Sequence, residues 1–409
     1  MQRHRIIIVG GGAAGFFAAI TAAEANPAAE VTILEKGPRF LDKVRISGGG
    51  RCNVTHACFD PIALARHYPR GERELRAPFT RFGPRQTIDW FAARGVALYT
   101  QEDGCLFPET DRSQTIIDCL LEAARKARVN LRTLAAPSAV ERNPAGGFAL
   151  HLPQGERLEC ERLLLATGGC RVASMGVLAT SLGHTLEPPV PSLFTFHIEV
   201  EWLRRLAGAV IDDVQLSTAS AGLKDRGILL LTHWGVSGPV VLKLSAWGAR
   251  KLAALSYRFT LQVNWLPALN LSEVQNVLED LRQAHPARLI VNTPLAPLTA
   301  RLWESLVLAA GIDKETRWSQ ASRAQQHKLA QMLTRTELPV TGKSLNKEEF
   351  VTCGGVRLRE VNFKTMGSRL CPGLHFAGEL LDIDGLTGGF NFQAAWTTGW
   401  IAGQAMAGA

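Results

Sequence analysis

The stretch Ile6-Ile7-Ile8-Val9-Gly10-Gly11-Gly12-Ala13-Ala14-Gly15 is an apolar run that leads directly into a G-x-G-x-x-G turn. A helical pattern of small residues follows over 16–25, and a second apolar run, 31–34, ends at Glu35. In such a unit the glycines permit a tight turn, close approach of a pyrophosphate, and close helix–strand packing. Glu35 stands twenty residues after Gly15, the usual position of a carboxylate that binds ribose hydroxyls. The pattern favours dinucleotide binding over a merely structural turn, with these predicted contacts: Gly10, Gly12, Ala13, Ala14, Gly15, Glu35 and Lys36.

The composition indicates a folded, basic protein. Its 409 residues exceed one ordinary domain, and 46% of them are hydrophobic, which suits a large core. The net charge is +8, and the richest basic stretch, 66–94, holds seven arginines. This stretch is either a solvated surface or a patch for phosphates, nucleic acid or an anionic substrate. The solvated surface is favoured, and structured RNA stays a candidate partner.

Two further features bear on location. Eight cysteines are scattered without a C-x-x-C pair, which favours reduced cytoplasmic thiols over a disulfide framework or a metal site. Residues 385–409 carry no charged side chain, but polar residues such as Asn391, Gln393 and Thr397 make them a poor membrane span. A buried helix is the better interpretation, so we expect a cytoplasmic protein without membrane contact or bound metal.

Two other apolar runs end in glycine turns. Residues 163–166 run into Thr167-Gly168-Gly169, and residues 374–377 run into Gly378-Glu379. Because the carboxyl ends of parallel strands share one edge of an open α/β sheet, these turns are predicted to meet the first turn at one ligand crevice.

The middle of the chain differs in composition and in periodicity. After Pro188-Pro189-Val190-Pro191, alternating stretches predict strands, and three later amphipathic patterns predict helices. Earlier strand-like stretches at 131–134, 147–152 and 157–160 predict a small antiparallel excursion. We therefore expect a Rossmann-like α/β domain interrupted by an insert, with these bounds: domain, 1–190 and 345–409; insert, 191–344, β-rich and barrel-like over 191–268 and 336–344, helical over 269–335.

Five motifs in the same order resemble the YhiN/BaiN-like flavoproteins. They are IIIVGGGAAGFFAA at 6–19, SGGGRCNVTH at 47–56, LLLATGG at 163–169, LLTHWGVSGPVVL at 230–242 and HFAGELLDIDGLTGGFNFQAAWTTGW at 375–400. The resemblance covers nearly the whole chain and implies FAD, a glutathione-reductase-like flavin domain, an inserted domain and oxidoreductase chemistry. Reductions of C=C bonds, in uridine of ribosomal RNA and in steroid-like rings, are associated with the family. One segment departs from the family, because the loop 169–177 is shorter than usual.

The resemblance and the glycine patterns together give the expected flavin contacts. A helix start at Gly388-Gly389 would direct free N–H groups to the flavin N1–C2=O edge, with an ordinary helix start as the alternative. Glu379 resembles the acid near the ribityl chain, or it is a solvated carboxylate. Arg51 offers a guanidinium to a phosphate or a substrate anion. Beyond the first unit, the expected contacts are Gly49, Gly50, Arg51, Cys52, Asn53, Ala166, Thr167, Gly168, Gly378, Glu379, Gly388, Gly389, Phe390 and Asn391.

The candidates for catalysis are fewer. His233 is the best general acid, because histidine titrates near neutral pH, although a single histidine is more often structural. Cys52 is expected to pack against the cofactor, with proton donation as the alternative, and Asn391 is a further candidate. No second strand with G-x-G-x-x-G is present, so NAD(P)H, the expected electron donor, would visit the same flavin face as the substrate.

The expected function is an FAD-dependent oxidoreductase that passes hydride from flavin N5 to an activated C=C bond. Uridine in structured RNA is the preferred substrate. Reduction of a small steroid-like molecule is one alternative, and an RNA-binding or assembly role with structural FAD is the other.

Overall fold

The structure is a computed structural model that describes residues 4–144, 146–170, 176–344 and 351–408. The chain divides into two compact units, which we call the sheet unit (Met1–Ser192 with Lys347–Ala409) and the barrel unit (Leu193–Asn346). These bounds lie beside the expected boundaries, 190/191 and 344/345. The second expected boundary borders residues outside the described ranges. Residues 171–175 of the short loop also lie outside these ranges.

The sheet unit is built on seven strands, and five of them are parallel. β1 (Arg5–Val9) is the middle one of the five parallel strands, and Ile6 to Val9 are buried, as parallel strands covered on both faces usually are. This arrangement confirms the predicted Rossmann-like domain. The order across the sheet is β19 (Val361–Asn362), β20 (Gly367–Ser368), β21 (Leu374–Phe376), β10 (Arg162–Leu165), β1, β2 (Glu30–Leu34) and β6 (Asn130–Arg132).

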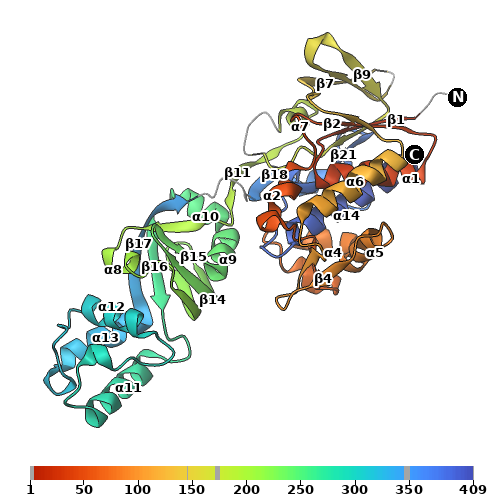
Figure 1. The fold of residues 1–409 in the computed structure, drawn as a ribbon. Helices are drawn as coiled ribbons and strands as arrows, with labels where there is room; N and C mark the ends of the chain where they lie inside the picture. Colours follow the sequence, from red (N-terminus) through yellow and green to blue (C-terminus); the bar gives the residue numbers. More distant parts are fainter. Residues whose placement is uncertain (1–3, 145, 171–175, 345–350, 409) are drawn as a thin grey trace. The chain divides into compact units, whose positions relative to one another are not determined.

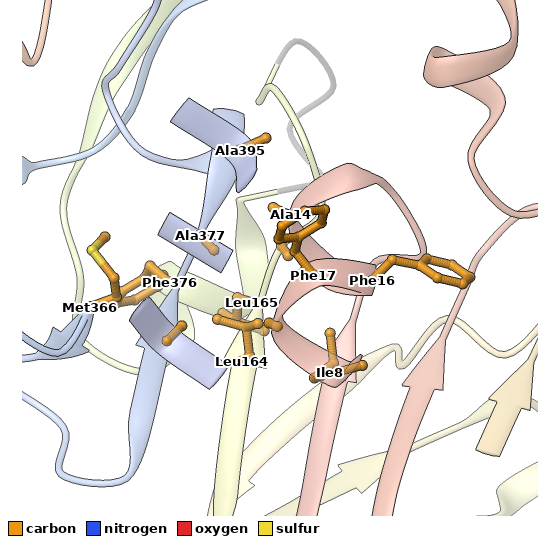
Figure 2. Close-up of a cluster of buried hydrophobic side chains, with 14 of the residues drawn as sticks. Ile8, Ala14, Phe16, Phe17, Leu164, Leu165, Met366, Phe376, Ala377 and Ala395 are labelled. Atoms are coloured by element: carbon orange, nitrogen blue, oxygen red, sulfur yellow. The ribbon is translucent and has the colours of Figure 1, made fainter. Parts of the chain in front are cut away.

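Two helices, α1 (Ala13–Ala25) and α14 (Phe390–Ala407), pack closely against each other beside this sheet (Figure 1). Their contact uses small residues, since a Cβ added at Gly399 would lie 2.5 Å from the Ala14 carbonyl oxygen. α14 is the buried helix of the uncharged C-terminal stretch, and no helix in the described ranges is long and apolar enough to cross a membrane. Figure 2 shows core side chains from the strands and both helices: Ile8, Leu164, Leu165, Phe376, Ala14, Phe17 and Ala395.

The predicted antiparallel excursion is formed by β7 (Ala139–Arg142), β8 (Phe148–His151) and β9 (Arg157–Cys160). The prediction for 131–134 was wrong, because β6 joins the edge of the main sheet in parallel with β2. The remaining elements of the sheet unit are α2 (Asp42–Gly50), β3 (Thr55–His56), α3 (Pro61–Ala65), α4 (Glu72–Arg81), α5 (Pro84–Ala92), β4 (Leu98–Thr100), β5 (Cys105–Pro108), α6 (Ser113–Lys126), η1 (Pro153–Gly155), α7 (Val177–Ser181), β11 (Leu186–Ser192), β18 (Val351–Val356), η5 (Leu358–Glu360) and η6 (Gly378–Leu380).

The barrel unit has its own hydrophobic core, and its strands close into the expected barrel. Its six strands close in the order β12 (Thr195–Ile198), β15 (Gly235–Ser237), β14 (Leu223–Thr232), β13 (Val210–Thr218), β16 (Phe259–Asn264) and β17 (Thr336–Ser344). The helices of this unit are α8 (Glu201–Arg204), α9 (Pro239–Trp247), α10 (Ala249–Ala254), α11 (Leu271–Ala284), η3 (Ile290–Asn292), α12 (Ala300–Ala309), η4 (Trp318–Gln320) and α13 (Arg323–Arg335).

Candidate active site

The glycine turn after β1 is shaped by two close contacts and one open position. A Cβ added at Gly10 would lie 2.2 Å from the Ala166 carbonyl oxygen, and one at Gly15 would lie 2.0 Å from the Gly10 carbonyl oxygen. A Cβ at Gly12 would meet nothing within 4 Å. Gly12 is also the N-cap of α1, which has no side-chain cap and no acidic residue in its first turn. Two glycines are therefore required by packing, and the third leaves a positive helix end open to an anion.

Glu35 is held at the end of β2 by backbone donors. Its two carboxylate oxygens accept hydrogen bonds from the Gly11 N–H (2.8 Å) and the Gly37 N–H (2.7 Å). These contacts place the carboxylate beside the glycine turn, where each oxygen retains a second lone pair for a ribose hydroxyl. The neighbouring Lys36 side chain is exposed to solvent.

The turns after β10 and β21 lie on the same edge of the sheet, as predicted. The Ala166 N–H bonds to the Val9 carbonyl oxygen at 2.8 Å, and the Ala377 N–H bonds to the Leu165 carbonyl oxygen at 3.2 Å. A Cβ added at Gly378 would lie 2.9 Å from the Ala14 side chain, so this turn approaches the first turn of α1. The carboxyl ends of three neighbouring strands thus form one continuous edge.

Glu379 on this edge is paired with Lys43, which is not among the predicted contacts. The Lys43 ammonium lies 2.5 Å from Oε2 of Glu379, and the Thr352 N–H donates to Oε1 at 2.9 Å. The same ammonium would lie 4.0 Å from a Cβ added at Gly168. Glu379 is therefore an ion-paired group on the edge. The only sequence signal for Lys43 is its place just before the second glycine loop.

The second glycine loop follows the helical part of α2. A Cβ added at Gly49 or at Gly50 would meet nothing within 4 Å, so the backbone here faces open space. The Arg51 guanidinium lies over the Phe107 ring at 4.1 Å and 3.7 Å from the Asp111 carboxylate. This loop is a second place where backbone can approach a ligand closely.

Cys52 closes this loop in a fully buried position. Burial raises the pKa of its thiol to about 12, because the thiolate is disfavoured away from water, and a hydrogen bond with Ser47 only partly offsets this. The environment therefore favours packing over proton donation.

The start of α14 differs from the expectation in one respect. The Asn53 side-chain amide donates to the Thr55 carbonyl oxygen (2.9 Å), and its oxygen accepts from the Gly389 N–H (3.2 Å). The Gly389 N–H is thus already engaged, and the prediction that both glycines present free N–H groups was wrong at this residue. Asn391 holds the preceding loop, since it accepts from the Gly385 N–H (2.8 Å) and donates to the Gly385 carbonyl oxygen (2.9 Å). These contacts support positioning roles for both asparagines.

The side chain of Phe390, the first residue of α14, packs against two histidine rings that are not among the predicted site residues. Its ring stacks on His56 with centroids 4.7 Å apart and on His67 with centroids 4.2 Å apart. The His56 Nε2 lies 3.1 Å from the Asp103 carbonyl oxygen, which fixes the ring. His56 belongs to the SGGGRCNVTH motif, whereas no sequence pattern marks His67.

His233 lies elsewhere in the chain, at an exposed two-residue turn between β14 and β15 of the barrel unit. The glycine turns belong to the other unit, the sheet unit. Its role as a general acid stays a prediction. Within the described ranges, no cluster of three or more histidine, cysteine or acidic side chains could hold a metal ion.

An open helix N-terminus, a fixed carboxylate and two further turns on one parallel-sheet edge define a dinucleotide-binding protein, and the open positions at Gly12, Gly49 and Gly50 fit FAD. The family model described as "HI0933-like protein Rossmann domain" matches residues 4–405. The chain therefore belongs to this YhiN/BaiN-like family of FAD-dependent oxidoreductases.

Two relatives are similar over almost their whole length. The ribosomal RNA dihydrouridine synthase of Escherichia coli K12 is 33% identical, over 99% of this chain and 98% of its own. The 3-dehydro-bile acid delta(4,6)-reductase of Clostridium scindens is 30% identical, over 99% of both chains.

Solved structures show a similar fold at low identity. The 3-ketosteroid delta1-dehydrogenase of Sterolibacterium denitrificans matches with a TM-score of 0.54 and 11% identity over 100% of both chains. The 3-ketosteroid-delta4-(5alpha)-dehydrogenase of Rhodococcus jostii RHA1 matches with a TM-score of 0.53 and 14% identity, over 99% of this chain and 97% of its own.

Proposed function

We propose that this enzyme reduces an activated C=C bond and that its substrate is uridine in ribosomal RNA. The observation that carries this proposal is the full-length similarity to the dihydrouridine synthase of E. coli. The net charge of +8 agrees with a polyanionic substrate, because phosphates attract a basic protein over long range.

Bound FAD supplies a hydride at N5. Gly12 and the uncapped start of α1 would hold the pyrophosphate, and Glu35 would bind the ribose. Gly49 and Gly50 would allow the second loop to lie against the cofactor. The positive end of α14 would stabilise negative charge on the reduced flavin.

The overall reaction consumes one NAD(P)H and one proton. The hydride ends on one carbon of the double bond and the proton on its neighbour, while NAD(P)⁺ and the dihydro product leave. Since the sequence holds one G-x-G-x-x-G unit, the donor and the substrate would use the same site in turn.

The test uses the purified holoenzyme and ribosomal RNA from cells that lack this gene. We expect dihydrouridine in the digested RNA when the enzyme and either NADH or NADPH are both present, and none when either is omitted. A flavin that is reduced by the donor and yet yields no dihydrouridine would contradict the RNA substrate and leave the oxidoreductase class intact.

Reduction of a steroid-like enone is the second candidate, because the bile acid reductase is 30% identical over the whole chain. Mixing the reduced holoenzyme with a 3-oxo-Δ4 bile acid distinguishes the two. Rapid flavin reoxidation by the bile acid, together with none by RNA, would favour this candidate.

A further inference from the structure

The segment between His56 and His67 forms an exposed surface beside the start of α14. Both imidazoles stack on Phe390, so the excursion that joins them begins and ends at this helix terminus. Within it, two large apolar side chains, Phe59 and Ile62, are 45% and 52% exposed and so are available to a partner. The surface therefore lies next to the end of the edge where the flavin ring is expected.

A basic side chain accompanies each of these two apolar residues. The Arg85 guanidinium, from α5, lies 4.9 Å from the centroid of the Phe59 ring. Ile62 and Arg66 are four residues apart along α3 and its C-cap, a spacing that places them on one side of the helix. We call Phe59, Ile62, Arg66 and Arg85 the Phe59 surface.

The charge of this surface is positive. Asp60, the one carboxylate between Phe59 and Arg66, caps α3 by accepting from the Ala63 N–H at 2.7 Å. Several arginines of the 66–94 stretch are ion-paired with acids, for example Arg76 with Glu72. In the described part of the chain, the Arg66 side chain has no such partner.

We propose that the Phe59 surface binds the RNA strand that flanks the reacting uridine. This inference rests on the proposed function. A ring held from one side by a guanidinium can stack a base on its other face, and free arginines can bind phosphates. A base that reacts at a flavin must leave its stack, so its neighbours need a surface beside the site. A steroid-like substrate has no phosphates for Arg66 and Arg85 to bind.

The test compares holoenzyme variants in binding a labelled ribosomal RNA hairpin over a range of salt concentrations. Phe59→Ala should weaken binding roughly 5- to 150-fold, the value of one stacked base, whereas Phe59→Trp should retain it. Arg66→Gln should lower the salt dependence by about one phosphate contact. Arg125→Gln, on the exposed surface of α6, removes the same charge elsewhere and should bind as the wild type does.

The FAD content of each variant, read from its absorbance, shows whether the fold is retained. Wild-type binding by both Phe59→Ala and Arg66→Gln, in a protein that still converts uridine, would overturn the Phe59 surface and leave the proposed function standing. A wild-type holoenzyme that neither binds nor converts RNA would overturn both. If Phe59→Ala impaired binding to whole ribosomal particles but not to free RNA, the surface would belong to a protein partner and the proposal would be wrong.

Discussion

The ammonium of Lys43 lies 2.5 Å from the carboxylate of Glu379 at the carboxyl edge of the sheet. This ion pair connects α2 with the turn after β21. The Lys43 side chain is 61% exposed, so the pair itself contributes at most about 1 kcal/mol to folding. Because the ammonium is largely exposed, it can also bind a phosphate of the cofactor in place of the carboxylate.

Lys43→Met should therefore weaken FAD binding while the unfolding free energy changes little. The loss of one charge-assisted contact predicts a Kd for FAD roughly 10- to 100-fold higher. Titration of the apoprotein with FAD, followed by flavin fluorescence, measures this change. Lys43→Arg keeps the charge and should bind nearly as well; equal affinity of the Met variant would show that Lys43 does not contact the cofactor.

Gly12→Ala and Gly10→Ala form a matched pair. At Gly12 a methyl group enters open space with φ of −93°, so the variant should fold as the wild type does and lose FAD affinity by at least about tenfold. At Gly10, φ is +116° and the methyl group would meet the Ala166 carbonyl oxygen, so this variant should be destabilised even without FAD. Thermal unfolding of both apoproteins and FAD titration separate the two effects. Full FAD affinity in the Gly12→Ala variant would place the pyrophosphate elsewhere.

The buried pair of Arg70 and Asp384 should be important for the stability of the sheet unit. The Asp384 side chain is fully buried and also accepts a hydrogen bond from the Ser192 hydroxyl at 2.6 Å. Arg70→Met leaves this carboxylate without its cation and should lower the unfolding free energy by roughly 3–5 kcal/mol. Arg76→Met breaks the exposed pair with Glu72 and should cost less than about 1 kcal/mol. Urea unfolding of both variants gives the comparison; similar costs for both would mean that burial adds nothing to the first pair.

His375 in β21 should make the protein less stable in mild acid. Burial lowers the pKa of this imidazole to about 4, whereas it returns to its ordinary value on unfolding. The unfolded chain therefore binds one more proton between these pKa values, and stability falls as the pH drops from about 6.5 towards 4. The expected loss between pH 7 and pH 5 is about 2 kcal/mol.

His375→Asn should remove this part of the pH dependence, which urea unfolding at pH 7 and pH 5 measures. The exposed His327→Asn serves as the control and should keep the wild-type difference. An unchanged pH dependence in His375→Asn would show that other groups take up the proton.

Local sequence patterns predicted the glycine turns at the carboxyl edge of the sheet. Contacts between residues far apart in the chain could not be predicted in this way. The turns at Gly10, Gly168 and Gly378 each follow an apolar run, and parallel pairing brings such turns together whatever lies between them. His56 and His67 both stack on Phe390, which comes from the other end of the chain, and local sequence spacing cannot predict such a contact. The same holds for the Gly389 N–H, whose acceptor Asn53 lies in the second glycine loop.

Ser192 and Val351 are paired residues of the antiparallel strands β11 and β18, so the chain departs for the barrel unit and returns at neighbouring points. Because the two ends of this insertion lie next to each other, the inserted segment can be lengthened, shortened or exchanged without a change in the strand register of the main sheet. The barrel unit is therefore the part of the fold that can be remodelled while the sheet that carries the glycine turns is kept.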